Sequence, residues 1–171
     1  MASALKNLSK YNEKNIPNAK EMTFGIVVSD WNKEITHALY KGCFDTLIKH
    51  KADSANIHTL QVPGAFELTT GARFLLQSKS PDAIICLGCV IKGETSHNEY
   101  INQAVATGLT QLSIATGRPV VFGLLTPNDE QQAKDRSGGK HGNKGVEAAV
   151  TAIRMAELRK DHGETKGKIG F

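Results

Sequence analysis

Segment 92–97 carries the residue types best suited to chemistry in this chain of 171 residues. Gly93 lets the backbone turn, and Glu94, Thr95 and Ser96 are typical of the start of a helix. A helix N-terminus presents free N–H groups and the positive end of the helix dipole, which favours an anion such as phosphate. An ordinary Ser/Thr N-cap explains the same residues, and taken alone the segment favours that simpler interpretation.

His97 falls in the first turn of this predicted helix. The helix dipole disfavours an imidazolium there, so we expect a neutral ring that can accept or relay a proton. A single histidine is more often structural than catalytic. Its position beside a candidate anion site is what distinguishes His97 from the other five histidines.

Other strand-to-helix junctions carry candidate binding residues. Trp31, the only tryptophan, follows an apolar run, where its indole can stack on a flat heterocycle or pack against a helix. Glu67 follows a Pro-Gly turn, and its carboxylate is either a simple helix-start residue or an acceptor for polyol hydroxyls. Segment 126–129 is typical of a structural capping box, with Thr126 as the cap.

Segment 136–145 combines four glycines with three permanent cations. Glycine allows close approach of the backbone to a ligand, and Arg136 can grip a phosphate with two hydrogen bonds. The residue order is not that of a Walker loop. A flexible loop between two helices is the alternative, but it does not explain why the cations are concentrated here.

Cys86 and Cys89 lie in one apolar run, and an offset of three residues places them on opposite faces of a strand. We therefore expect buried core thiols rather than a redox pair, and no second cysteine pair exists to complete a zinc site. Three cysteines in all make no disulfide framework, which indicates reduced thiols and a cytoplasmic protein.

Charge and hydropathy exclude several classes of partner. The net charge of +4 arises from the two ends, since residues 23–153 carry twelve basic and twelve acidic residues. We therefore expect no nucleic-acid partner. The longest apolar run, 83–91, is nine residues long, whereas a membrane helix needs about 18. The polar N-terminal residues show no secretory signal, so we expect no membrane partner.

The elements that position these residues alternate along the chain. Apolar, β-branched runs at 23–29, 56–62, 83–91 and 119–125 predict strands, and helical spacing covers 32–50, 66–77, 97–116 and 146–158. Continuous apolar strands suit a parallel sheet covered on both faces. We predict an α/β fold, a three-layer αβα sandwich around a short four-stranded parallel sheet with flavodoxin-like topology. Ligands bind at the carboxyl ends of such strands.

The chain resembles the lumazine synthase family over residues 23–158. The resemblance depends on four motifs in the family's order and spacing: 63–67, 90–97, 121–126, and 142–145 following Arg136. It predicts an N-terminal arm at 1–22, a synthase domain at 23–158 and a C-terminal tail at 159–171. Asn98 departs from the aromatic residue that often follows the catalytic histidine.

The resemblance implies the penultimate step of riboflavin biosynthesis. In that reaction 5-amino-6-(D-ribitylamino)uracil condenses with 3,4-dihydroxy-2-butanone 4-phosphate to 6,7-dimethyl-8-ribityllumazine, releasing phosphate and water without a metal or redox cofactor. It implies a role for each site residue. Trp31 stacks on the pyrimidine, with Asn32 bonding nearby; Ala65, Phe66 and Glu67 hold the ribityl chain; Val90, Ile91 and Lys92 supply backbone contacts; Gly93, Glu94, Thr95 and Arg136 line the phosphate pocket; His97 transfers protons.

The family's sites are shared between subunits, so the resemblance implies that Phe122, Arg136 and Lys144 reach the site from a neighbour in a homopentamer. Some members assemble into shells of sixty subunits, and the short loop 137–143 favours a shell. The N-terminal arm would then add an edge strand to a neighbour's sheet, and a riboflavin synthase is a suggested further partner.

Two rival functions remain from the sequence. A flavodoxin-like flavin-binding module would need a phosphate loop after the first strand, and segment 29–34 is not one. A structural shell subunit with a decayed site is disfavoured by the presence of Trp31, Glu67, His97 and Arg136.

Overall fold

The computed structural model describes residues 7–164, and its centre is a four-stranded parallel sheet in the order β2-β1-β3-β4. The strands are β1 (Phe24–Ser29), β2 (Ile57–Val62), β3 (Ala83–Cys89) and β4 (Val120–Leu125). The longer helices are α1 (Lys33–Lys49), α2 (Leu68–Lys79), α3 (His97–Thr116), α4 (Glu130–Arg136) and α5 (Lys144–Glu164). Short 3-10 turns cover Glu13–Asn15 and Ser54–Asn56, and a hairpin joins β5 (Ser137–Gly139) to β6 (Gly142–Asn143).

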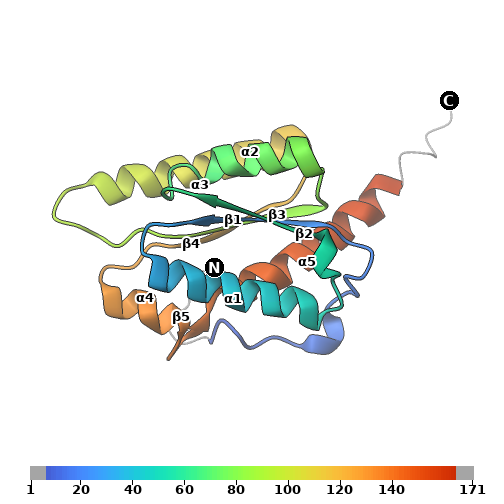
Figure 1. Ribbon diagram of the computed structural model, residues 1–171, viewed down its shortest axis with the longest axis horizontal. Coiled ribbons are helices and arrows are strands. Elements are labelled where there is room, and N and C mark those ends of the chain that lie inside the picture. The colour runs from blue at the N-terminus through green and yellow to red at the C-terminus, as the bar shows by residue number, and fades with distance from the viewer. Residues whose placement is uncertain (1–6, 165–171) are drawn as a thin grey trace.

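Helices cover both faces of the sheet, so the predicted three-layer αβα sandwich is confirmed (Figure 1). Helices α2 and α3 pack together on one face, while α1 packs against α5 on the other, with α4 on the same side. Each layer buries one side of the strands in its own hydrophobic cluster.

Burial along the strands follows their place in the sheet. Every residue of the two central strands, β1 and β3, is buried, which explains their continuous apolar sequences. The edge strands β2 and β4 instead expose some residues. As predicted, Cys86 and Cys89 are buried on opposite faces of β3, in different clusters. All three cysteines are free, and burial raises the pKa of the Cys43 and Cys86 thiols.

The region after β4 differs most from the predictions. Thr126 is not a helix cap, because helix α4 begins only at Glu130 and its N-cap is Asp129, whose carboxylate accepts from Gln132 N at 2.8 Å. Segment 136–145 is not a flexible helix–helix loop either. Its residues 137–143 form the β5–β6 hairpin, whose sharp turns use the positive φ of Gly138 (130°) and Gly142 (82°).

The division into arm, domain and tail stays a prediction, and its outermost parts, 1–6 and 165–171, lie outside the described residues. Ala19 and Met22, from the predicted arm, are buried in the core beneath α1 and α5. Helix α5 is longer than predicted and runs through residue 158 to Glu164. Of the helices in the described part of the chain, none combines the length and the hydropathy of a membrane-spanning helix.

Candidate functional site: a cleft at the carboxyl ends of β1 and β3

The strand order reverses between β1 and β3, because the chain passes from β1 to β2 on one side and then crosses to β3 on the other. In open parallel sheets this switch point opens a crevice at the carboxyl ends of the strands. Asn32, just after β1, spans the crevice by donating from Nδ2 to the carbonyl of Cys89, the last residue of β3, at 2.9 Å.

Backbone hydrogen bonds connect the other loops at this edge. The N–H groups of Asp30 and Trp31 donate to Val62 O and Pro63 O, at 2.8 and 3.2 Å, which ties the loop after β1 to the turn after β2. On the opposite side, Val90 N donates to Leu125 O at 2.9 Å. The backbone hydrogen bonding of the sheet therefore continues beyond the strand ends and holds the loops that surround the switch point.

The cleft at this point has a volume of about 510 Å³. Ten of the predicted site residues line it: Trp31, Asn32, Ala65, Phe66, Glu67, Val90, Ile91, Gly93, Thr95 and His97. They come from the ends of three different strands and from the start of α3. The prediction that these junctions meet at one edge of the sheet is confirmed, whereas their roles toward a ligand stay predictions.

Two large aromatic side chains stand exposed at the cleft. Trp31 is 73% exposed and Phe66 is 58% exposed. The sequence left open whether Trp31 packs on a helix of its own chain, and this exposure favours a ligand or another chain as its partner.

Asn32 has a backbone conformation that few residues adopt. Its φ of 59° and ψ of 47° lie in the left-handed region, which asparagine tolerates better than other non-glycine residues. The conformation turns the chain from β1 into α1 and leaves the side chain directed to β3, so Asn32 fixes the distance between the two walls of the cleft.

The backbone beyond β3 offers only some of its groups to a ligand. Val90 N and Lys92 N donate to Leu125 O and Pro127 O, at 2.9 and 3.0 Å, so these two N–H groups face β4. Backbone groups alternate in direction along an extended chain, which turns the N–H of Ile91 toward the loop after β1. Among the three residues predicted to supply backbone contacts, Ile91 is therefore the best placed donor.

The N-terminus of α3 opens into the cleft at His97, which is its first residue. The helix begins at residue 97, as the helical spacing predicted: Ser96 occupies the N-cap position, and Thr95 Oγ1 accepts from His97 N at 3.4 Å. Gly93 has no positive φ, so the turn does not require glycine. A Cβ at Gly93 would meet no atom within 4 Å, and the residue leaves free space beside the helix N-terminus.

Five predicted site residues lie outside the cleft: Lys92, Glu94, Phe122, Arg136 and Lys144. Arg136 is the last residue of α4 and donates from Nη1 to Gln132 O at 3.1 Å. Lys144 begins α5 and pairs with Glu147 at 2.6 Å. Phe122 is 38% exposed on the edge strand β4.

Three lining residues were missed by sequence reasoning: Gly64, Cys89 and Ile101. Asn98, which the sequence singled out only as a departure from the family's aromatic residue, lines the cleft as well. Ile101 lies one helical turn after His97, and that spacing could have identified it. Burial raises the pKa of the Cys89 thiol to about 12, so this side chain is neutral. Within residues 7–164, no group of three or more His, Cys, Asp and Glu side chains is arranged to hold a metal ion.

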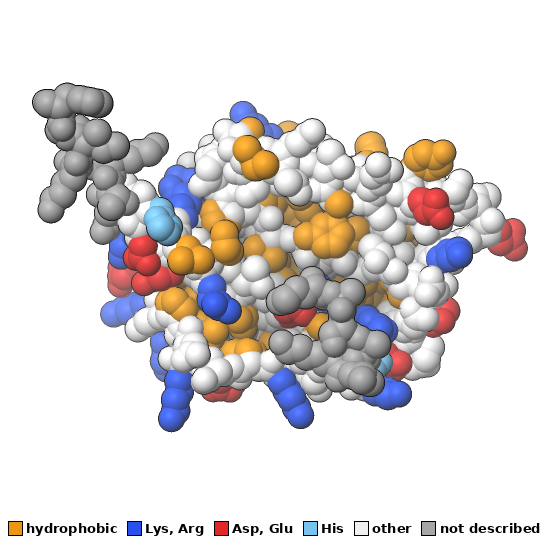
Figure 2. All heavy atoms as spheres, turned by 180° about the vertical axis from the view of Figure 1, so that it is seen from behind, with side chains coloured by type: hydrophobic (Ala, Val, Ile, Leu, Met, Phe, Trp, Pro, Cys, Tyr) orange, Lys and Arg blue, Asp and Glu red, His pale blue; other side chains and the backbone are white. Residues whose placement is uncertain are grey.

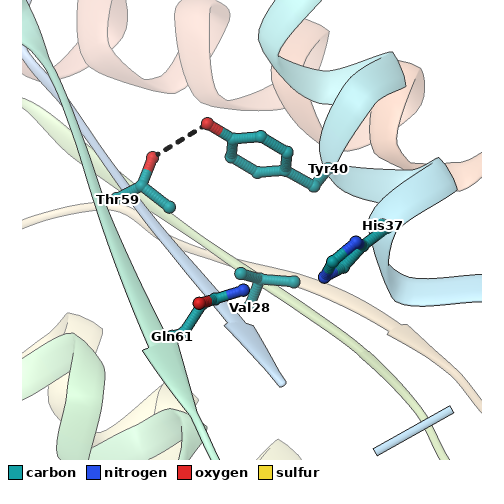
Figure 3. A pocket seen from close by; sticks show the side chains of 5 residues that line it. All are labelled: Val28, His37, Tyr40, Thr59 and Gln61. Carbon is teal, nitrogen blue, oxygen red and sulfur yellow. Dashed lines mark hydrogen bonds between the residues drawn. The ribbon is translucent and has the colours of Figure 1, made fainter. Parts of the chain in front are cut away.

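A second hollow of about 440 Å³ lies between α1 and the free edge of β2 (Figure 3). Its side chains are Val28, His37, Tyr40, Thr59 and Gln61, and the Tyr40 hydroxyl lies 3.2 Å from Thr59 Oγ1. None of its lining residues belongs to the first turn of a helix or to the loops that follow β1 and β3, so we place the candidate active site in the cleft.

A doubly wound α/β sandwich with a ligand cleft at its switch point defines a small-molecule-binding protein of flavodoxin-like architecture. The sequence of residues 21–160 matches the family described as 6,7-dimethyl-8-ribityllumazine synthase. The chain belongs to this family.

Relatives that carry the same name resemble the chain over nearly its whole length. The protein from Cytophaga hutchinsonii is 53% identical over 155 residues, which cover 91% of this chain and 97% of the relative. Those from Flavobacterium psychrophilum and Parabacteroides distasonis are 51% identical over 171 residues and 50% identical over 158 residues. These matches cover 100% and 92% of this chain, and 88% and 99% of the relatives.

Proposed function

We propose that this protein is a transferase that forms 6,7-dimethyl-8-ribityllumazine from 5-amino-6-(D-ribitylamino)uracil and 3,4-dihydroxy-2-butanone 4-phosphate. The family match over residues 21–160 carries the proposal. The cleft supports it independently, since an exposed indole and the N-terminus of a helix lie on one cleft and suit a flat heterocycle and a phosphate.

Each wall of the cleft has a task in this reaction. Trp31 stacks on the pyrimidine, and Asn32 keeps the loops after β1 and β3 at the right separation. Ala65, Phe66 and Glu67 hold the ribityl chain, with the Glu67 carboxylate accepting from its hydroxyls. Ile91 contributes a backbone contact through its N–H group, which is turned toward the loop after β1.

The phosphate end of the second substrate lies at the N-terminus of α3. Gly93 leaves the space, Thr95 supplies a hydroxyl, and the helix dipole stabilises the negative charge. His97 relays protons during imine formation, phosphate elimination and ring closure. The phosphate departs from a position in which the helix already stabilises its charge.

The site is completed by Phe122, Arg136 and Lys144 of an adjacent subunit. All three lie outside the cleft of their own chain, which supports this proposal. Figure 2 shows hydrophobic side chains gathered on the face behind the view of Figure 1. The edge strand β4 and its neighbours α3 and α5 carry exposed Phe122, Ile114 and Met155, and contiguous exposed apolar surface is typical of subunit interfaces.

We further propose a homopentamer as the basic assembly and, from the short hairpin at 137–143, a sixty-subunit shell. An N-terminal arm from a neighbour would run along the free edge of β2 and cover the hollow beside Tyr40. Association with a riboflavin synthase belongs to the same proposal. Three free, buried cysteines fit the predicted cytoplasmic location.

The deciding experiment mixes the purified protein with both substrates and follows the fluorescence of the lumazine product. A rate well above the spontaneous condensation supports the proposal, and a rate equal to it refutes the proposal. We expect Arg136→Ala to lose more activity than His97→Ala, because each charge-assisted phosphate contact contributes about 1.5–3 kcal/mol whereas the condensation has an uncatalysed route. A larger loss in His97→Ala would overturn this ranking.

A further inference from the structure

The side chain of Asn143, which lies outside the cleft, makes three hydrogen bonds. Its Nδ2 donates to Ala38 O of α1 at 2.8 Å and to Ser137 O of β5 at 3.1 Å. Its Oδ1 accepts from Gly145 N at 2.8 Å, which is the hydrogen bond of a helix N-cap at the start of α5. One amide therefore joins three separate elements.

The surrounding residues form a socket for this amide. A Cβ at Gly42 would lie 2.7 Å from both the Cγ and the Nδ2 of Asn143. A Cβ at Gly145 would lie 2.9 Å from its Oδ1 and would also clash with Leu39 O. Because neither glycine has a side chain, α1 and the start of α5 approach closely enough for the three hydrogen bonds to form.

The backbone of Asn143 is held as well. Ser9 Oγ accepts from Asn143 N at 2.9 Å, and Leu8 N donates to His141 O at 2.7 Å. The hairpin is thus pinned from outside by residues 7–9 and from inside by α1, although its glycines alone would leave it free to move.

The importance of this arrangement comes from what flanks the hairpin. Ser137, whose carbonyl Asn143 binds, directly follows Arg136, and Lys144 directly follows Asn143. The Asn143 side chain therefore fixes, relative to α1, the chain at both points from which these two cations project.

We propose that Asn143 is a positioning residue that sets the place of Arg136 and thereby controls affinity for the phosphorylated substrate. The inference rests on the proposed function, because it assumes that Arg136 serves a neighbour's phosphate pocket. A displacement of about 1 Å in a positioning element suffices to weaken a charge-assisted contact substantially. The pyrimidine end of the cleft, built from other elements, does not depend on Asn143.

The test compares the Michaelis constants for the two substrates in Asn143→Asp. Aspartate keeps the acceptor for Gly145 N but replaces both Nδ2 donors by an oxygen that faces the carbonyls of Ala38 and Ser137. We expect the KM for the butanone phosphate to rise about tenfold, while the KM for the pyrimidine changes less than about twofold. A merely structural role would lower the thermal midpoint and kcat without separating the two constants.

Two further variants check this result, one as a charge-matched control and one as an independent test of the socket. Asn18→Asp makes the same change of charge at an exposed residue whose Oδ1 accepts from Lys20 N, and it should leave both constants unchanged. Gly42→Ala displaces the Asn143 amide by contact while improving helix propensity, so it tests the socket if Asn143→Asp does not fold. A rise confined to the phosphorylated substrate supports the proposal in either variant, and constants that rise together or not at all overturn it.

Calorimetric titration with inorganic phosphate separates this inference from the proposed function. If the wild type catalyses no condensation, the proposed function fails, and the inference is judged by phosphate affinity alone. About tenfold weaker phosphate binding in Asn143→Asp than in the wild type supports the inference. Equal binding by the two proteins, or none by the wild type, contradicts it.

Discussion

Asn32 offers a sharp test of how the cleft is held open, because the residue combines a strained backbone with a bridging side chain. Its φ is 59°, and its Nδ2 donates to Cys89 O at 2.9 Å across the switch point. Replacement by alanine removes the hydrogen bond and leaves a Cβ in the left-handed region. Replacement by glycine removes the same hydrogen bond but adopts this backbone freely.

The two losses have separate magnitudes. A hydrogen bond of this kind contributes about 1 kcal/mol net, and the left-handed conformation costs an ordinary L-residue about 1–2 kcal/mol. We therefore expect Asn32→Ala to lower the free energy of unfolding by about 2–3 kcal/mol. Asn32→Gly should be more stable than Asn32→Ala by about 1 kcal/mol, although glycine also adds entropy to the unfolded chain.

Urea unfolding at one fixed protomer concentration measures both variants, since the stability of the proposed oligomer would depend on concentration. Activity gives the second readout, because both variants lose the bridge that fixes the walls of the cleft and both should therefore lower kcat/KM. Equal stabilities of the alanine and glycine variants would refute the strained backbone. Full activity in both would refute the role of the bridge.

Two further predictions concern packing and pH. Gly71→Ala should destabilise the protein by about 1–3 kcal/mol, because its Cβ would lie 2.7 Å from Val27 Cγ1 and 2.9 Å from Val62 Cγ1. The control is Gly163→Ala, whose Cβ would meet no atom within 4 Å and which should be neutral or slightly stabilising in the same urea titration. Equal effects of the two substitutions would contradict the close packing at Gly71. Burial and then the charge of Lys49 lower the pKa of His50, whose Nε2 lies 3.0 Å from the Tyr11 hydroxyl. Because the unfolded chain then binds more protons, stability should fall as the pH drops through the ordinary value of 6.5. The urea midpoint should decrease less in His50→Gln than in the wild type between about pH 7.5 and about pH 5.5, and an equal decrease in both would show that His50 is not responsible.

The strands and the position of the cleft could be predicted because burial on both faces leaves a continuous apolar sequence. The predicted run 83–91 overshoots β3 by only two residues, and α3 has the predicted bounds, since Gly117 ends it with a positive φ. Once the strands are placed in a parallel sheet, the junction residues must gather at the carboxyl edge.

The region after β4 could not be predicted from local signals. Thr126 and Asp129 are both good cap residues, and only the observed path of the chain places the helix after Asp129. The hairpin at 137–143 lacks any apolar period, so its glycines indicated a loop. Beyond Leu158 the sequence of α5 is almost entirely polar, which gave no reason to extend the helix to Glu164.

The candidate site also has a part that could be predicted from one sequence and a part that could not. Ten of its predicted residues come together in one chain, whereas Phe122, Arg136 and Lys144 were assigned to a neighbour's site only through resemblance to a family. No pattern within one sequence reports which residues a neighbouring copy contributes, because an interface is set by the surfaces of two folded subunits.

Mixing two defective variants tests the shared site most directly. Trp31→Ala damages the cleft and Arg136→Ala damages the contribution to the neighbour, so each homo-oligomer should condense the two substrates poorly. When the two are unfolded and reassembled together in equal amounts, roughly a quarter of the sites in a ring combine an intact cleft with an intact neighbouring arginine. We expect the mixture to recover roughly a quarter of the wild-type rate of lumazine formation. A rate no higher than the average of the two variants measured separately would contradict it.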